Sequence, residues 1–395
     1  MKNDYTILAI ETSCDETAAA VVRDGREVLS SVVYSQTALH AKYGGVVPEL
    51  ASRSHIDEIG VVTEKALKEA GRPINGIDAV AVTFGAGLAG ALLVGVSYAK
   101  ALAYAAEKPL IAVNHIQGHI AAGYIAYPEL RPPFLCLVAS GGHTSLVAAR
   151  DYVRFEVLGS AKDDAAGEAF DKIARFIGLP YPGGPNLEKL AEEGKPVIDF
   201  YKHPLKPSPD FDFSFSGLKT AVVTWVKNAQ LKGSAQCTVH SPQLKDGVIH
   251  AERNGDERNK SETVDCGLCT VHSKSESELL NSQFSILNSK ADIAASFQKA
   301  AVDILVRNVK NAVYKTGLKT VTAAGGVAAN GYFARRLEAE ARKAGADCLI
   351  LPKRLCGDNA AMIGAAAYYQ VKSGLPFAPL SLNARPSLKI GENAR

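Results

Sequence analysis

Two segments of the same kind, each with the pattern of a strand, a tight turn and a second strand, lie far apart in the chain. The first is "YTILAIETSCDETAAAVV" at residues 5–22, and the second is "FLCLVASGGHTSLVAA" at residues 134–149. Each has an apolar run, a turn of small and polar residues, and another apolar run, which is the pattern of a β-hairpin. Repetition of a whole supersecondary unit predicts two related domains.

The segments between and after these hairpins alternate helical and strand patterns. Residues 48–71 have a proline suited to a first helical turn, apolar residues three and four apart, and a glycine that ends the helix. A strand, a double glycine and an amphipathic helix follow at 318–345. This alternation predicts an α/β fold. We expect a first domain at 1–125 and a second at 126–395, with the helix after residue 358 packing back near the cleft between them.

Residues 232–289 interrupt this alternation. The segment is polar and carries "CTVHS" twice and "LNS" twice, which is typical of inserted low-complexity sequence. Its "CTVH" and "CGLCTVH" groups have zinc-ligand spacing, so a small zinc site is the alternative, although a four-ligand framework with standard spacing is lacking. We expect a polar, flexible insertion within the second domain.

Composition and the N-terminus exclude several classes of protein. The formal net charge is +3 and no long basic run occurs, so any nucleic acid must bind a local patch. The N-terminus lacks the apolar core of a signal peptide, and no apolar run reaches the roughly 18–20 residues of a membrane span. The seven cysteines are an odd number, which favours reduced thiols. We expect a cytoplasmic protein without a membrane partner.

One short helical segment, "VNHIQGHIAAG", carries two histidines at helical spacing. His115 and His119 are four residues apart, so both rings lie on one face and can bind the same metal ion. Two histidines are too few ligands for a divalent ion, and on spacing alone a surface helix with two polar side chains is the slightly better interpretation. The glutamate that zinc proteases carry after the first histidine is absent, so peptide hydrolysis lacks its general base.

Three other motifs contain candidate site residues. Asp358 in "LCGDNAAMIG" lies in a polar loop ahead of a helix, where it suits a third metal ligand or a helix N-cap equally well. Ser140, Gly141 and Gly142 of "SGGHTS" form a turn whose backbone N–H groups can approach an anion, although a plain turn also explains them. Asp171 is the odd member of an acidic helical segment, because it lies near the apolar side.

Nine motifs occur in the order of one protein family. They are "ETSCDETAAAVV", "YGGVVPELASRSH", "HIQGH", "SGGHT", "DDAAGEAFDK", "YPGGP", "FSFSGLKT", "AAGGVAAN" and "CGDNAAMIG". The sequence resembles the TsaD family of tRNA N6-adenosine threonylcarbamoyltransferases, whose older name is O-sialoglycoprotein endopeptidase. The resemblance covers nearly the whole chain except 232–289. It implies the actin, Hsp70 and sugar-kinase type of fold, in which two related α/β domains enclose a nucleotide-binding cleft.

The resemblance also implies the roles of individual residues. The metal ligands are His115, His119 and Asp358, which hold one divalent ion, Fe(II) in first place and zinc as the alternative. The adenylate of the substrate is bound by Val138, Ala139, Ser140, Gly141, Gly142, Asp171, Gly184, Glu188 and Asn330. No general base is identified, and Glu11 and Asp15 in the first hairpin are only candidates for that role.

The implied reaction transfers the threonylcarbamoyl group from threonylcarbamoyl-AMP to N6 of the adenosine adjacent to the anticodon on its 3′ side, in tRNAs reading ANN codons. The product is N6-threonylcarbamoyladenosine. The implied partners are tRNA, a separate synthase that makes threonylcarbamoyl-AMP, and bacterial TsaB-like and TsaE-like subunits.

Two other functions are compatible with the same fold, because a fold does not determine its function. One is an ATP-dependent phosphotransferase like a sugar kinase, and the other is a noncatalytic scaffold subunit of the same complex. The paired histidines argue against both, since sugar kinases do not need them and the family's shorter scaffold relative lacks them.

Overall fold

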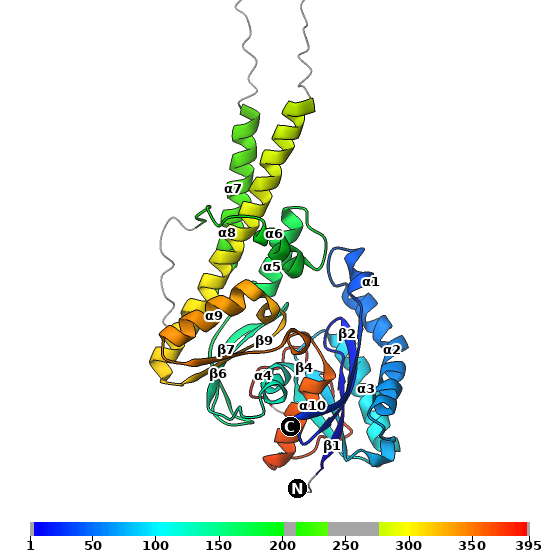
Figure 1. The fold of residues 1–395 in the computed structure, drawn as a ribbon. Coiled ribbons are helices and arrows are strands. Elements are labelled where there is room, and N and C mark those ends of the chain that lie inside the picture. The colour runs from blue at the N-terminus through cyan, green and yellow to red at the C-terminus, as the bar shows by residue number, and fades with distance from the viewer. Residues whose placement is uncertain (1–3, 201–210, 236–275, 393–395) are drawn as a thin grey trace, which may run out of the picture.

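The computed structural model describes residues 4–200, 211–235 and 276–392. Its strands form two five-stranded sheets, ordered β3-β2-β1-β4-β5 and β10-β9-β6-β7-β8. In Figure 1 the first sheet lies to the right and the second to the left, each with helices around it.

The first sheet begins with the first predicted hairpin. Its strands are β1 (Thr6–Glu11), β2 (Glu16–Arg23), β3 (Glu27–Ser35), β4 (Ala79–Gly85) and β5 (Leu110–Asn114). Strand β1 runs antiparallel to β2 and parallel to β4, and β4 runs parallel to β5. The first hairpin is therefore confirmed. Every residue of β1 is buried, as expected for a central strand covered on both faces.

The second sheet repeats this connectivity. Its strands are β6 (Phe134–Ala139), β7 (Thr144–Ala149), β8 (Phe155–Ser160), β9 (Thr320–Ala324) and β10 (Asp347–Ile350). Strand β6 runs antiparallel to β7 and parallel to β9, and β9 runs parallel to β10. Strands β6 to β10 thus stand in the places of β1 to β5. The predicted α/β fold with two related halves is confirmed, whereas the boundary between residues 125 and 126 remains a prediction.

Helices α2 (Pro48–Glu69), α3 (Ala89–Ala105), α4 (His115–Ala126) and α10 (Ala360–Lys372) cover the two faces of the first sheet. The short helices α1 (Thr37–Ala41) and η1 (Ile74–Gly76) lie in its connections. Alternate residues of β1 point to opposite faces. Ile7 and Ala9 belong to the large core that includes α4 and α10, whereas Leu8 and Ile10 pack in smaller cores with α2 and α3. The α2 helix begins at the predicted proline and ends just before Gly71.

Helices α4 and α10 join the two halves. Helix α4 contacts β5 of the first sheet and β6 and β9 of the second, and it packs along α10. Two glycines permit this close packing. A Cβ on Gly118 of α4 would lie 2.6 Å from the Cδ1 of Ile363, and a Cβ on Gly364 of α10 would lie 2.7 Å from the Cγ2 of Val22. A side chain at Gly118 would therefore crowd α10, and one at Gly364 would crowd the sheet beneath α10.

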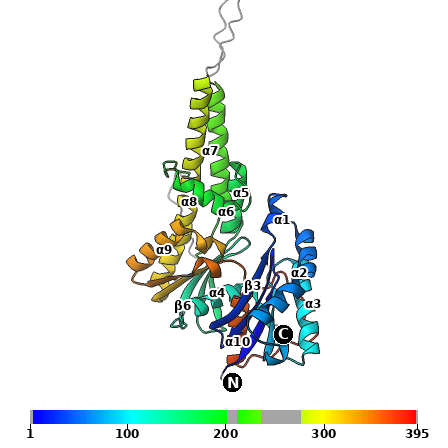
Figure 2. The same ribbon diagram turned by 45° about the vertical axis from the view of Figure 1, so that its right-hand side comes forward.

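The second half carries the remaining helices. They are α5 (Ala166–Phe176), α6 (Gly183–Glu192), α7 (Ser216–Ala235), α8 (Glu276–Thr316), η2 (Gly326–Ala329), α9 (Gly331–Lys343) and η3 (Lys353–Leu355). Helices α7 and α8 lie side by side and project beyond the rest of the fold in both views (Figures 1 and 2). They include the ends of the predicted insertion at 232–235 and 276–289. Residues 236–275, with the cysteines considered as zinc ligands, lie outside the described residues, so flexibility and zinc binding remain predictions.

The chain after α10 returns to the first sheet. Ala378 forms a β-bridge with Leu110, and the backbone N–H of Arg385 donates to the carbonyl of Phe84 at 2.7 Å. Among the described residues no helix combines the length and the apolar character needed to cross a bilayer. The four described cysteines are all free thiols.

Candidate metal centre and cleft

Helix α4 places both histidines inside the protein. It follows β5 directly, and Asn114 at the end of that strand caps it by accepting a hydrogen bond from the backbone N–H of Ile116 at 2.9 Å. Every residue from His115 to Tyr124 is buried. The interpretation as a surface helix is therefore wrong. The physical reason is that, apart from Gln117, the residues around the two histidines are apolar or small on every side of the helix, which is typical of a buried helix.

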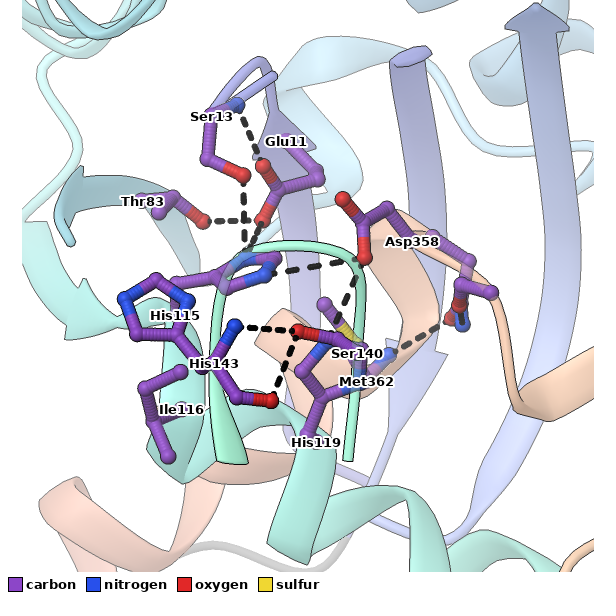
Figure 3. A network of polar contacts seen from close by, with 12 residues as sticks. Glu11, Ser13, Thr83, His115, Ile116, His119, Ser140, His143, Asp358 and Met362 are labelled. Atoms are coloured by element: carbon purple, nitrogen blue, oxygen red, sulfur yellow. Dashed lines mark hydrogen bonds and ion pairs between the residues drawn. The ribbon is translucent and has the colours of Figure 1, made fainter. Parts of the chain in front are cut away.

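The two histidines converge on one carboxylate. The Oδ1 atom of Asp358 lies 3.6 Å from Nε2 of His115 and 3.2 Å from Nε2 of His119, and Figure 3 shows the three side chains around one point. One ligand atom from each residue falls within 4.8 Å of the other two. The histidine rings meet edge to face with 4.6 Å between their centroids. This group can hold a metal ion.

Asp358 does not cap the helix that follows it. The neighbouring residue, Asn359, is the N-cap of α10, because its side chain accepts a hydrogen bond from the backbone N–H of Met362 at 3.0 Å. The carboxylate of Asp358 faces the histidines instead. The N-cap interpretation of Asp358 is therefore wrong.

The environment of His119 shows that the residues suit a metal ion. Its side chain is fully buried, its Nδ1 has no hydrogen-bond partner among the described residues, and its Nε2 lies 3.2 Å from Oδ1 of Asp358 without hydrogen-bond geometry. Buried polar atoms in proteins almost always have a partner, because an unpaired one costs free energy. A divalent ion bound to Nε2 would supply that partner, and imidazole nitrogens with a carboxylate oxygen are a donor set that suits iron or zinc.

The electrostatics of the cluster favour a positive charge at its centre. Burial alone would lower the pKa of His115, but the carboxylates of Asp358 and Glu11 raise it to about 9. Burial would raise the pKa of Asp358, but His115 and His119 lower it far below its usual value. The pKa of His143, across the cleft, is lowered to about 4 by burial and by His115 and His119. The buried carboxylates thus stabilise a cation, whether a proton or a metal ion.

A cleft of about 540 Å³ opens beside the metal-binding group. Its walls come from both halves, with Ser13, Asp15 and His115 on one side and the turn at 140–143 and helices α5 and α6 on the other. The volume falls within the roughly 300–1,000 Å³ typical of small-molecule sites. Because His115 and Asp358 line the same cleft, a bound ligand would reach the metal-binding group.

Seven of the nine predicted adenylate-binding residues line this cleft: Ser140, Gly141, Gly142, Asp171, Gly184, Glu188 and Asn330. The other two, Val138 and Ala139, lie in β6, where both are buried, and they do not line it. A Cβ added to Gly141 or Gly142 would meet nothing within 4 Å, so the backbone of this turn is open to a ligand.

The polar side chains of this wall hold its backbone in place. The Oδ1 of Asp171 accepts hydrogen bonds from the backbone N–H groups of Gly183 (2.8 Å) and Gly184 (3.1 Å). Burial raises the pKa of Asp171, and these two bonds oppose that rise. In the same way the Oε1 of Glu188 accepts from the backbone N–H of Gly331 at 2.6 Å. The two carboxylates therefore tie α5, α6 and the start of α9 into one wall.

The two candidates for the general base lie in different places. Asp15 lines the cleft, and the hydroxyl of Tyr181 donates to its Oδ2 at 3.4 Å. Glu11 is fully buried behind His115 and does not line the cleft. Its Oε2 lies 3.1 Å from Nδ1 of His115 and accepts a hydrogen bond from the hydroxyl of Thr83 at 2.6 Å.

Several residues of the site were not predicted from the sequence. Ser13 and Thr83 surround Glu11, while Tyr181 and His143 line the cleft. Tyr181 and His143 belong to the motifs "YPGGP" and "SGGHT", so the motifs themselves were the available signal. Thr83 carried a weaker signal, because it is a polar residue near the end of an otherwise apolar strand.

Comparison with known proteins identifies the family. The family model described as tRNA N6-adenosine threonylcarbamoyltransferase, TsaD, matches residues 27–365. The chain belongs to this family. It is 47% identical over 393 residues to the tRNA N6-adenosine threonylcarbamoyltransferase of Clostridium novyi (strain NT), with 99% of this chain and 100% of the relative covered. The relative of that name from Clostridium kluyveri (strain NBRC 12016) is also 47% identical over 393 residues, with the same coverage.

Among solved structures, HypF from T. kodakarensis has a similar fold. The TM-score is 0.56 at 13% sequence identity, and the match covers 95% of this chain and 48% of HypF. At this identity the likeness shows the fold alone. The predicted family and transferase class are confirmed, and so is the predicted α/β fold with two related halves. The phosphotransferase and scaffold alternatives receive no support from the family or its relatives.

Proposed function

We propose that this protein transfers the threonylcarbamoyl group from threonylcarbamoyl-AMP to N6 of the adenosine adjacent to the anticodon on its 3′ side, in tRNAs reading ANN codons. The observation that carries the proposal is that one cleft contains both the metal-binding group and seven predicted adenylate-binding residues, in a chain of this family. One substrate molecule can therefore contact both.

We assign the metal ligands as His115, His119 and Asp358, holding one divalent ion, Fe(II) with zinc as the alternative. When bound, the ion supplies a Lewis acid next to the acyl group. The protein's own contribution is to hold two buried histidines and a partly buried Asp358 in a preformed group and to leave His115 and Asp358 open to the cleft.

The opposite wall suits the adenylate. The open turn at Gly141 and Gly142 offers backbone N–H groups to the phosphate, which carries the negative charge that increases as AMP leaves. Asp171 and Glu188 supply carboxylates near the start of α6 and α9, suited to ribose hydroxyls. Fixing the adenylate in this way orients the carbamoyl carbon for attack.

Asp15 is the better candidate for the general base, because its side chain lines the cleft whereas Glu11 lies beneath it. In the proposed step N6 of adenosine forms a bond to the carbamoyl carbon and the bond from that carbon to the phosphate oxygen breaks. The proton from N6 passes to the carboxylate of Asp15, and AMP departs with the electron pair of the broken bond.

The proposed partners are tRNA, a separate synthase that makes threonylcarbamoyl-AMP, and TsaB-like and TsaE-like subunits. Apolar side chains on α2 and α3 support a protein partner, since Ile56, Val61, Leu93 and Tyr104 are between 45% and 74% exposed. Because tRNA is the proposed substrate, we also propose a cytoplasmic location.

The test supplies purified protein and the bacterial partners with threonylcarbamoyl-AMP and unmodified tRNA, and measures modified adenosine by mass spectrometry. We expect product with the parent protein and with Glu340→Gln, a control on α9 that does not line the cleft, and loss of product with His115→Ala. Equal yields from the parent and His115→Ala, or no product from any sample, would contradict the proposal. Parallel incubation with ATP and sugars tests for phosphotransfer.

A further inference from the structure

We propose that Glu11 is a positioning residue, which fixes the ring proton of His115 on Nδ1 and so presents Nε2 to the metal ion. This inference rests on the metal site of the proposed function. Glu11 would then act through His115, which makes it a different kind of residue from the general base considered above.

The contacts of Glu11 carry the inference. Its side chain is fully buried at the end of β1. The Oε1 atom accepts a hydrogen bond from the backbone N–H of Ser13 at 2.5 Å, and Oε2 accepts from the hydroxyl of Thr83 at 2.6 Å. Nδ1 of His115 lies 3.1 Å from the same Oε2. Figure 3 shows Glu11 and Ser13 at one ring nitrogen of His115 and Asp358 at the other.

Hydrogen-bond chemistry then decides which nitrogen of His115 carries the proton. An ionised carboxylate has no hydrogen and can only accept, so a ring nitrogen in hydrogen-bond contact with it must donate. Nδ1 therefore keeps its hydrogen, and Nε2 is the nitrogen that offers a lone pair when a metal ion replaces the second ring proton. That nitrogen lies 3.6 Å from Oδ1 of Asp358, on the side where the metal ligands meet. A carboxylate that accepts a hydrogen bond from the ring nitrogen not bound to the metal orients a metal-binding histidine.

The sheet holds Glu11 and Thr83 in register. Glu11 ends β1 and Thr83 lies near the end of β4, and these strands are parallel neighbours, with β4 also paired to β5, which leads into α4. Glu11, Thr83 and His115 therefore lie at or just after the carboxyl ends of β1, β4 and β5, at the same edge of the sheet. The distance between Glu11 and His115 is set by strand pairing, not by a mobile loop.

The two histidine ligands are supported differently. His119 has no hydrogen-bond partner on Nδ1 among the described residues, and its polar contact is with Asp358 on Nε2. His115 has Glu11 on Nδ1, and the hydroxyl of Ser13 also lies 3.1 Å from that nitrogen. His115 is thus the preoriented ligand of the pair.

The test measures metal affinity in the full-length protein. In Glu11→Gln the side-chain amide faces donors that the carboxylate accepted from, so its NH₂ group has no good place. If the NH₂ faces Ser13, it opposes the backbone N–H of that residue. If the NH₂ faces His115, Nδ1 must accept, and the ring proton moves to Nε2. We expect affinity for Fe(II), Co(II) and Zn(II), measured by chelator competition, to fall about 10–100-fold. The visible spectrum of the Co(II) form should change as well, since it reports ligand geometry.

A second variant and a control keep the outcome interpretable. Thr83→Val removes one donor to Glu11 and keeps the side-chain shape, so we expect a smaller loss of about 2–10-fold in metal affinity. Glu340→Gln also removes a carboxylate, but on α9 where it pairs with Lys310 and Lys343, and metal affinity should be unchanged. Circular dichroism checks that each variant is folded before metal is added.

Each remaining outcome has a definite meaning. If folded Glu11→Gln binds metal as tightly as the parent and keeps the Co(II) spectrum, the positioning role is wrong. If it does so while turnover falls, Glu11 acts in proton transfer instead. Failure of the proposed function looks different, because the parent would then bind metal and be sensitive to Glu11→Gln and yet form no modified adenosine.

Discussion

The contact between Gly364 of α10 and Val22 of β2 gives a sharp prediction about stability. A Cβ at Gly364 would lie 2.7 Å from Cγ2 and 2.9 Å from Cβ of Val22, whereas carbon atoms prefer about 3.5–4.0 Å. The Cβ of Val22 cannot rotate away, so α10 or β2 must move. Gly364→Ala should therefore incur the cost of overpacking a core, about 1–3 kcal/mol.

A matched substitution isolates this cost. Gly60 lies in α2, is exposed, and would place its Cβ with nothing within 4 Å. Replacing glycine by alanine inside a helix favours the helix by about 1 kcal/mol at both positions. We therefore expect Gly60→Ala to raise the free energy of unfolding by about 1 kcal/mol. The free energy of unfolding of Gly364→Ala should be about 1–3 kcal/mol lower than that of Gly60→Ala.

Urea unfolding followed by circular dichroism measures the difference, with each transition fitted separately because the chain has two halves. Metal affinity is the second readout, since Asp358 lies just before α10 and a shift of this helix would displace a ligand. Equal stabilisation by both substitutions would refute the steric argument. It would show that the helix and strand can separate at no cost.

Three further predictions concern other parts of the molecule. Gly167→Ala should weaken adenylate binding and leave metal binding intact, because its Cβ would lie 2.6 Å from the carbonyl oxygen of Ser140 and displace the open turn. Calorimetry with AMP measures the first effect, and chelator competition measures the second. Tyr181→Phe removes the hydroxyl that donates to Asp15, and should raise KM for threonylcarbamoyl-AMP about 2–10-fold in steady-state kinetics; an unchanged KM would show that the bond does not shape the cleft. The ion pairs of Glu340 with Lys310 and Lys343 lower its pKa to about 2, so they stabilise the fold above the unfolded pKa of 4.5 and lose this effect as the pH falls toward 2. Urea midpoints of the parent and Glu340→Gln should therefore differ at pH 7 and converge in acid, and a constant difference would contradict the linkage.

Local patterns predicted the fold well because its elements follow local rules. Both hairpins alternate between apolar runs and polar turns, and α2 begins at Pro48 and ends before Gly71, as capping preferences require. Helix α4 was misjudged because two histidines suggested a polar face. Its surroundings of Ile116, Ile120 and small residues were the better signal, since they leave no side for water.

The metal-binding group could be predicted only in part, because its members come from distant segments. Helical spacing places His115 beside His119, but nothing local distinguishes Asp358 as a ligand from Asp358 as a cap, and family resemblance supplied that choice. Glu11 and Thr83 are harder still, since only the pairing of β1 with β4 and β5 brings them behind His115. Tertiary register of this kind leaves no trace in sequence spacing.

The return of α10 to the first sheet has a consequence for biosynthesis. Both histidines leave the ribosome with the first third of the chain, but the carboxylate that joins them follows roughly 240 residues later. At about 5–20 residues per second that interval is on the order of 10–50 s. Until α10 emerges and docks on β1 and β2, the nascent first half has neither its covering helix nor its third ligand. If the group binds a metal ion as proposed, a nascent chain that ends before Asp358 lacks one of the three ligands, and complete coordination must wait for the last part of translation.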